Sequence, residues 1–268
     1  MKLSWLTDLH LDRIGARRRI TFFNRLRGQE ADVFVITGDI SRADRLPFDL
    51  RGLARACAPR PIFFTLGNHD FHGGSFGAVD QAVAEVCKLE RNLVHLGHGE
   101  AIPLTETAVL IGYRGWYDGR AGYGHRSNLH NSDHRRIEDL RRLSEKATFA
   151  KMEELGRASA RYLRNVLPYA LTCYRQVWIA THVPPFIQAA TFSGRPCGPR
   201  HLPHFTNISA GGAIQGIAQK FPNRGVTVLC GHTHDRSAIH VRPNIQVYTG
   251  ASKRGDPQIQ WLFDVAST

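Results

Sequence analysis

Short apolar runs alternate with longer amphipathic stretches along most of the chain, and this alternation restricts the possible folds more than any other feature. The apolar runs predict strands at 3–7, 33–37, 62–66, 108–112, 177–181 and 226–230. The amphipathic stretches predict helices at 17–27, 47–57, 77–89, 133–143, 149–167 and 213–221. Further apolar runs around Ile239, at 245–248 and at 259–263 indicate a closing set of antiparallel strands. The whole pattern is typical of an α/β fold.

Two segments fit neither pattern. Residues 115–132 are rich in Gly, His, Arg and aromatic side chains, and residues 184–209 contain five prolines. Loops of this length in a compact domain are often functional. The chain has 268 residues, a length that allows one large domain or two modest ones. We predict a single domain over 1–268, with insertions near 115–147 and 184–209.

The sequence carries no sign of a membrane segment or a disulfide framework. No apolar run approaches the ~20 residues that cross a bilayer, and Asp8 comes too early for the apolar region of a signal peptide. We therefore expect a cytoplasmic protein that begins at Met1 and does not associate with a membrane. The five cysteines are an odd number without C-x-x-C spacing, which argues against disulfides and a zinc–thiolate site. Cys230 ends an apolar run and is expected to be buried.

The chain is strongly basic, with 35 Lys and Arg against 23 Asp and Glu and a net charge of +12. Such an excess can attract polyanions such as nucleic acid or phosphorylated metabolites. It can equally be a solvated, Arg-rich surface, because the arginines are spread along the chain. One group, Arg135, Arg136, Arg141 and Arg142, is predicted to lie on one side of the helix at 133–143. Either a solvated helix face or a phosphate contact would account for that group.

Polar clusters follow the predicted strands directly. They are Asp8-Leu9-His10, Gly38-Asp39, Gly67-Asn68-His69-Asp70, His182 and Gly231-His232-Thr233-His234. Open α/β sheets gather their ligand sites at strand ends, and residues two apart can project the same way from an extended backbone. We therefore expect these side chains to share one site. The glycines at 38, 67 and 231 fit a backbone that turns sharply or packs closely beside it.

The donor types in these clusters point to metal binding. Carboxylate, imidazole and amide oxygen without thiolate suit Mn²⁺, Fe²⁺ or Zn²⁺ and are too rich in nitrogen for Ca²⁺ or Mg²⁺ alone. Seven candidate ligands exceed the needs of one tetrahedral ion, whereas two ions that share a carboxylate accommodate all of them. Two divalent ions with Asp8 and Asp39 leave a positive pocket, suited to a phosphate and a bridging hydroxide. The alternative to metal binding is a purely structural role, in which these residues cap turns and fill the core.

In this order the motifs D-x-H, G-D, G-N-H-D, H and G-H-x-H resemble those of the calcineurin-like metallophosphoesterases. The resemblance runs from Asp8 to His234, nearly the whole chain, and implies a four-layer α/β/β/α sandwich with two central mixed β-sheets. It implies one metal ion held by Asp8, His10, Asp39 and His234. It implies a second ion held by Asp39, Asn68, His182 and His232, with Asp39 bridging. His69 would then protonate the leaving group, and Asp70 would orient His69.

The implied function is metal-dependent hydrolysis of a phosphate ester, a monoester, diester or nucleotide, by a hydroxide that two metal ions hold. The G-D-I-S-R sequence from Gly38 lacks the V-D-R-G continuation of Ser/Thr protein phosphatases, and Asp70 stands where those enzymes carry Glu. The UDP-2,3-diacylglucosamine hydrolases of lipid A synthesis, which cleave a pyrophosphate, share D-L-H-L and G-H-T-H. They usually carry Arg in place of His69, so they remain a minor alternative.

An alternative from another class is a nucleic-acid-binding protein on the same scaffold with vestigial hydrolysis. Such a protein would bind nucleic acid through its positive charge. It would be expected to have lost at least one metal ligand. All seven candidates are present. Three further residues are candidate substrate contacts, namely His72, Trp116 and His204. For the two histidines a packing or surface position is the favoured alternative, and Trp116 is equally suited to the core. His72 follows the G-N-H-D motif, Trp116 could stack on a base or aryl group, and His204 lies in the proline-rich loop.

Overall fold

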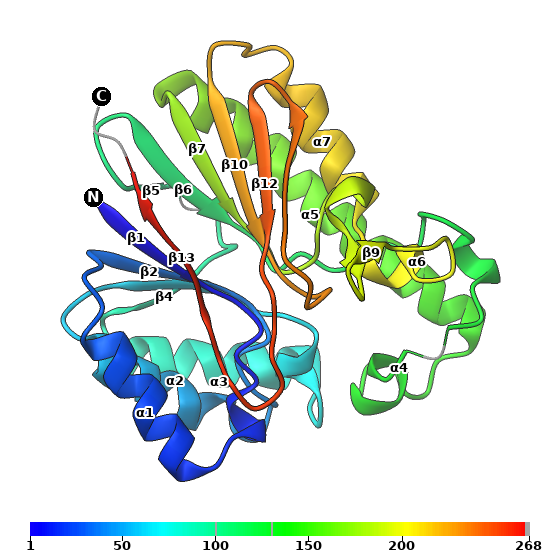
Figure 1. Ribbon diagram of the computed structural model, residues 1–268. Helices are drawn as coiled ribbons and strands as arrows, with labels where there is room; N and C mark the ends of the chain where they lie inside the picture. Colours follow the sequence, from blue (N-terminus) through cyan, green and yellow to red (C-terminus); the bar gives the residue numbers. More distant parts are fainter. Residues whose placement is uncertain (100, 130, 266–268) are drawn as a thin grey trace.

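The computed structural model describes residues 1–99, 101–129 and 131–265, and it contains two β-sheets that pack face to face (Figure 1). The first sheet has five strands in the order β13-β1-β2-β3-β4. Its strands are β1 (Lys2–Leu6), β2 (Val33–Thr37), β3 (Ile62–Thr65), β4 (Leu93–His95) and β13 (Ile259–Asp264). Strands β1 to β4 run parallel, and β13 pairs antiparallel with β1.

The second sheet has six strands in the order β11-β12-β10-β7-β6-β5. Its strands are β5 (Ile102–Pro103), β6 (Ala108–Gly112), β7 (Gln176–Ala180), β10 (Gly225–Cys230), β11 (Ser237–Arg242) and β12 (Ile245–Thr249). The four central strands are parallel, while the edge strands β5 and β11 are antiparallel to their neighbours. The sheet is therefore mixed, as the first one is.

Helices cover the outer face of each sheet (Figure 1). The first sheet carries α1 (Ala16–Arg27), α2 (Leu46–Cys57) and α3 (Phe76–Leu89), and the second carries α5 (Glu145–Cys173) and α7 (Ile208–Ala218). Apolar side chains form one core between each sheet and its helices, and a third core lies between the sheets around Trp5, Val35 and Trp178. These four layers confirm the expected α/β/β/α sandwich.

The two segments predicted to be insertions form short elements that lie together at one side of the molecule (Figure 1). They contain the helices α4 (Asp133–Arg136) and α6 (Leu202–Phe205) and the hairpin of β8 (Thr191–Phe192) and β9 (Arg195–Pro196). Single 3-10 turns occur at η1 (Leu11–Arg13), η2 (His69–Phe71), η3 (Gly124–Arg126) and η4 (Ile187–Ala189). The ring centroids of His134 in α4 and His204 in α6 are 5.7 Å apart, so the two insertions contact each other.

The predicted helix at 133–143 is wrong beyond its first turn. Helix α4 ends at Arg136, because Ile137 takes an extended backbone with φ −99° and ψ 127°. A tight turn follows, in which the backbone N–H of Arg141 donates to the carbonyl of Ile137. The four arginines of this segment therefore do not share one helix face.

Two helix starts and the direction of one strand also differ from the sequence-based expectation. Helix α5 begins earlier than predicted because Ser144 caps it, accepting a hydrogen bond from the amide of Ala147 at 3.3 Å. Asn207 caps α7 in the same way through Ala210 at 2.9 Å. Strand β12 is parallel to β10 rather than antiparallel, since it lies between β10 and its own hairpin partner β11.

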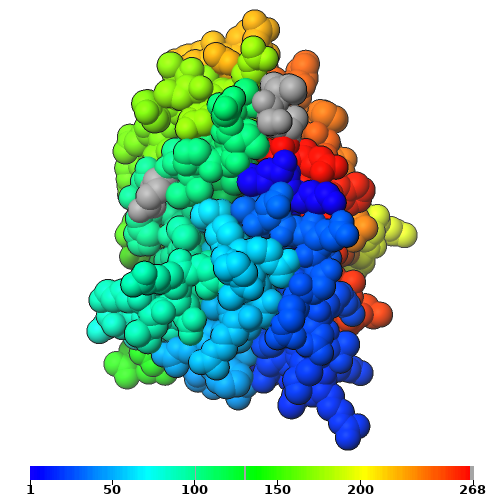
Figure 2. Space-filling model, turned by 90° about the vertical axis from the view of Figure 1, so that its left-hand side faces the viewer, coloured from blue at the N-terminus to red at the C-terminus, as the bar shows by residue number. Residues whose placement is uncertain are grey.

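The two ends of the described chain lie side by side in the first sheet. Strand β13 pairs along β1, and the amide of Val265 donates to the carbonyl of Met1. Figure 2 shows the blue and red surfaces of these segments in contact. Within the described ranges, no helix combines the length and apolar character needed to span a membrane, and this includes the 29-residue α5.

Candidate metal centre

All five polar clusters lie at one edge of the paired sheets. Those of Asp8, Asp39 and Asn68 follow β1, β2 and β3 of the first sheet, and those of His182 and His232 follow β7 and β10 of the second. Parallel strands place their carboxyl ends at the same edge. Because the sheets pack face to face, side chains from both can meet there.

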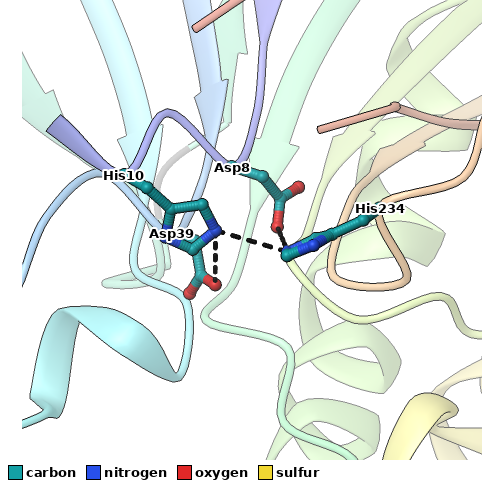
Figure 3. A group of neighbouring side chains, drawn as sticks. All are labelled: Asp8, His10, Asp39 and His234. Atoms are coloured by element: carbon teal, nitrogen blue, oxygen red, sulfur yellow. Dashed lines mark hydrogen bonds and ion pairs between the residues drawn. The ribbon is translucent and has the colours of Figure 1, made fainter. Parts of the chain in front are cut away.

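One group of side chains joins Asp8, His10, Asp39 and His234. One donor atom from each lies within 4.8 Å of the others (Figure 3). The Nε2 atoms of His10 and His234 are 3.3 Å apart, and Nε2 of His234 is 3.3 Å from an Asp8 carboxylate oxygen. Oδ2 of Asp39 lies 3.8 Å from Nε2 of His10. Such a convergence of nitrogen and carboxylate donors suits a divalent cation.

A second group surrounds the amide oxygen of Asn68. Nε2 of His182 lies 3.0 Å and Nδ1 of His232 lies 2.9 Å from Oδ1 of Asn68. Nε2 of His182 is also 3.2 Å from Oδ1 of Asp39. Asp39 thus presents Oδ2 to the first group and Oδ1 to the second, as a bridging ligand would.

Backbone carbonyls set the tautomers of both histidines in this second group. Nδ1 of His182 donates to the carbonyl of Thr37 at 2.8 Å, and Nε2 of His232 donates to that of His204 at 2.8 Å. In a neutral imidazole the other nitrogen then carries a lone pair. Two lone pairs therefore face the carbonyl oxygen of Asn68 with no proton between them, an arrangement that a cation would stabilise.

Burial and neighbouring charges shift the pKa values of Asp39 and Asp8 in opposite directions. Burial raises the pKa of Asp39 well above its usual value, and the negative charges of Asp8 and Asp70 raise it further. Burial acts the same way on Asp8, but the hydrogen bond from His234 and the nearby His182 outweigh it and lower the pKa. Burial lowers the pKa of His10 to about 3 and that of His232 to about 4. These two imidazoles are neutral at pH 7, as ligation requires.

The backbone of the candidate ligands is strained. Asp8, His10, Asp39, His232 and His234 all have positive φ, between 44° and 72°. Among the described residues other than glycine, only Ser193 shares this conformation. Each left-handed residue of this kind costs on the order of 1–3 kcal/mol and persists only where surrounding structure enforces it. Strain is thus concentrated at this site.

Glycine is required where the backbone passes closest to these side chains. A Cβ atom on Gly67 would meet Oδ1 of Asp39 and Nε2 of His182, and one on Gly231 would meet the carboxylate of Asp8. Gly38 has a φ of +86°. The close approach and the sharp turn expected of these three glycines are both present.

Asp70 does not have the position expected of an orienting partner for His69. Its carboxylate accepts hydrogen bonds from the amides of Ile40, Ser41 and Gly67, at 2.8 to 2.9 Å. It therefore ties the loop after β2 to the loop after β3. Burial raises the pKa of Asp70 to about 7, although these backbone N–H groups act to lower it.

Arg13, which the sequence analysis missed, is the charged group at the ring of His69. Its Nη2 donates to Nδ1 of His69 at 2.9 Å. The amide of His69 donates to Oδ1 of Asp39 at 2.8 Å, so the residue is fixed from both sides. The only sequence signal for Arg13 is its place shortly after the D-x-H motif.

Asp133 is the second residue missed. It is buried at 1% exposure and accepts hydrogen bonds from Nδ2 of Asn68 at 3.0 and 3.1 Å, Nε2 of His72 at 2.6 Å and the hydroxyl of Tyr117 at 2.8 Å. Burial raises its pKa, but the contacts with His72 and Asn68 prevail and lower it. The carboxylate turns the amide nitrogen of Asn68 away from the histidines and its oxygen toward them.

The three candidate substrate contacts have different places. Trp116 is 2% exposed and packs edge-on against Phe71 and Phe76 in the core, so its ring is not available to stack on a substrate. His72 is buried against Asp133. His204 lines a cavity of about 490 Å³ together with Asp39, Asn68 and His69. Cys230 is buried, as expected.

A family model described as calcineurin-like phosphoesterase matches residues 1–236. A dimetal phosphatase from Danio rerio has a similar structure, with a TM-score of 0.59 and 13% identity, over 94% of this chain and 87% of that one. A protein from Thermus thermophilus aligns with a TM-score of 0.50 and 10% identity, over 93% and 88%. These identities show a shared fold. No curated protein sequence matches.

Replacing Asp133 by alanine should destabilise the metal-free protein by at least about 3 kcal/mol, because each of three buried donors left without an acceptor costs about 1–3 kcal/mol. Urea unfolding with a chelator present measures the change. Asp44→Ala is the control, since the ion pair of Asp44 with Arg42 is about half exposed and such pairs contribute about 0–1 kcal/mol. Equal losses in the two variants would contradict this account of Asp133.

Metal binding should release protons, and metal affinity should rise with pH. Below its raised pKa, Asp39 holds a proton that a metal ion must displace, whereas His10 and His232 are already neutral. Calorimetric titration with Mn²⁺ in buffers of different ionisation enthalpy measures the release. Asp39→Asn should abolish most of it and Asp44→Asn should not. Proton release that Asp39→Asn leaves undiminished would show that the histidines, not Asp39, carry the displaced protons.

Proposed function

The chain belongs to the calcineurin-like phosphoesterase family, and we propose that it hydrolyses phosphate esters with two divalent metal ions. The observation that carries the proposal is the position of Asp39. Its two carboxylate oxygens face different donor groups, His10 on one side and His182 on the other. A carboxylate placed in this way can bridge two ions.

In this proposal Asp8, His10, Asp39 and His234 hold one ion, and Asp39, Asn68, His182 and His232 hold the other. The donor set suits Mn²⁺ or Fe²⁺, with Zn²⁺ as a further candidate. When bound, such ions neutralise developing charge on a phosphoryl group and lower the pKa of a water molecule. The facing lone pairs of His182 and His232 and the bridging position of Asp39 support this assignment.

In this proposal His69 supplies the proton for the leaving group. Arg13 donates to Nδ1 of His69, which leaves Nε2 as the protonated nitrogen of the neutral ring. Burial lowers the pKa of His69, and the neighbouring His10 and His72 lower it further. His69 lines the cavity of about 490 Å³ beside the candidate metal ligands, which we call the metal cavity. We assign Nε2–H of His69 to the oxygen of the departing alcohol, to which it donates its hydrogen bond and then its proton as the P–O bond breaks. Arg13, rather than Asp70, sets this tautomer, and its guanidinium charge offsets the negative charge that the proton leaves on the ring.

The size of the metal cavity favours small substrates. Its volume is about 490 Å³, and Phe192 and Phe205 contribute apolar wall beside the histidines. A cavity of this volume accommodates a small phosphate ester or a nucleotide. Binding of nucleic acid through the positive surface stays a prediction.

A panel of substrates and metals tests the proposal. Metal-stripped protein is supplied separately with Mn²⁺, Fe²⁺, Zn²⁺ and Mg²⁺ and assayed with mono-aryl phosphates, bis-aryl phosphates and cyclic nucleotides. We expect turnover with one or more of the first three ions. Asp39→Ala should lose both metal and activity, whereas Asp44→Ala should keep both. If no phosphate ester is hydrolysed with any ion, or if Asp39→Ala retains two equivalents of metal and normal turnover, the proposal is wrong.

Changing His69 to asparagine should leave the metal content intact and lower turnover of alkyl phosphates by about 10²–10⁴-fold, the usual contribution of a general acid. The loss should be smaller for nitrophenyl esters, whose leaving group departs without a proton. Steady-state kinetics with both substrates, alongside mass spectrometry of bound metal, measures the effect. His240→Asn, on the exposed side of β11, is the control. An equal loss with both esters would assign His69 to charge stabilisation instead.

A further inference from the structure

A second cavity of about 550 Å³ adjoins the metal cavity. The two share Leu129, Asn131 and His204 as wall residues. Beyond this shared wall, the second cavity is lined by His134, Arg135 and Arg141 and by the first two turns of α5. It is therefore formed by the first insertion and the start of α5, and His204 is its one described lining residue from the second insertion.

Two arginines give this cavity its charge. Arg135 and Arg141 both line it, whereas Arg136 and Arg142 do not. Throughout the described parts of the chain, neither Arg135 nor Arg141 is seen to form an ion pair. Glu145 is the one carboxylate in the lining, so a positive charge remains. The early end of α4 and the turn at Ile137 bring these two arginines, six positions apart in the sequence, to one cavity.

The N-terminus of α5 adds to this positive character. Glu145, Thr148 and Phe149, in its first two turns, line the cavity. A helix of 29 residues presents free amide N–H groups and the positive end of its dipole at this terminus. Ser144 caps one of these amides, that of Ala147. Helix N-termini in general favour phosphate and other anions.

His204 points independently to a ligand. Its side chain is buried, at 1% exposure for the residue, and neither ring nitrogen has a hydrogen-bond partner among the described residues. An imidazole ring always carries at least one N–H donor, and in its neutral form it also carries one acceptor nitrogen. Buried polar atoms are rarely left without partners. The backbone carbonyl of His204 meanwhile binds the candidate metal ligand His232.

We propose that the second cavity binds a phosphate group in the part of the substrate that leaves, between Arg135 and Arg141. The inference rests on the proposed function and narrows its substrate class to phosphate esters that carry a second phosphate. Guanidinium groups bind phosphate through paired hydrogen bonds. His204, between the cavities, would contact the linking part of such a molecule while its first phosphate lies at the metal centre.

A matched pair of sugars tests the proposal. Glucose 6-phosphate and glucose 1,6-bisphosphate are compared as substrates of the Mn²⁺-loaded wild-type protein, the double variant Arg135→Gln/Arg141→Gln and the control Arg136→Gln/Arg142→Gln. The control removes the same charge from the same segment without altering the cavity lining. We expect the bisphosphate to have the lower KM in the wild type. The first variant should raise that KM by roughly tenfold or more, as loss of charge-assisted contacts does, with kcat and the monophosphate KM unchanged.

Direct binding separates this proposal from the proposed function. Calorimetric titration of the metal-free protein with glucose 1,6-bisphosphate should show binding that Arg135→Gln/Arg141→Gln weakens and the control does not. Hydrolysis of p-nitrophenyl phosphate without any preference for the bisphosphate, in KM or in binding, would overturn the second-phosphate site and leave the proposed function standing. Equal effects of the two double variants would show non-specific charge attraction and would also overturn it. Absence of all hydrolysis together with the expected binding would overturn the proposed function alone.

Discussion

The site depends on a constraint of the backbone: the chain must leave parallel strands of two sheets at one edge and turn at once. Asp8, His10, Asp39, His232 and His234 meet this constraint in left-handed conformations, which ordinary residues avoid. The pairing of β1 with β2 and of β7 with β10 fixes the positions of these turns. The hydrogen bond from His182 to the carbonyl of Thr37 links the two sheets at the same place. Packing of the sandwich thus holds a geometry that none of these loops would keep alone.

The buried carboxylates near the site differ in what they contact. Asp8 and Asp39 face imidazole nitrogens, so their charges are directed toward the space where a cation would lie. Asp70 and Asp133 face N–H groups instead: Asp70 holds backbone amides, and Asp133 holds the side chains of Asn68 and His72. A buried carboxylate is tolerated when such partners satisfy it. Asp70 and Asp133 thus keep the loops and the amide of Asn68 in the orientation on which the arrangement around Asp8 and Asp39 depends.

Sequence patterns predicted the sandwich well because each layer leaves a local signature. Strands β1, β2 and β7 are buried apolar runs, and α1, α2 and α3 each bury one face. The shortest elements, such as β5 and β8 with two residues each, leave no periodicity to detect. The turn at Ile137 was missed for a related reason, since the amphipathic pattern continues across it while the backbone does not.

The sequence by itself determined the types of the candidate ligands, their order and their places at strand ends, because each cluster directly follows a run that must be a strand. Tertiary structure alone decided which groups support them. Arg13 reaches His69 across 56 positions and Asp133 reaches Asn68 across 65, and no local pattern specifies contacts at such separations. The same holds for Trp116, which the core buries, and for Arg135 and Arg141, which a turn rather than a helix brings to one cavity. Side-chain partners depend on how the layers and insertions pack, and packing is a property of the whole chain.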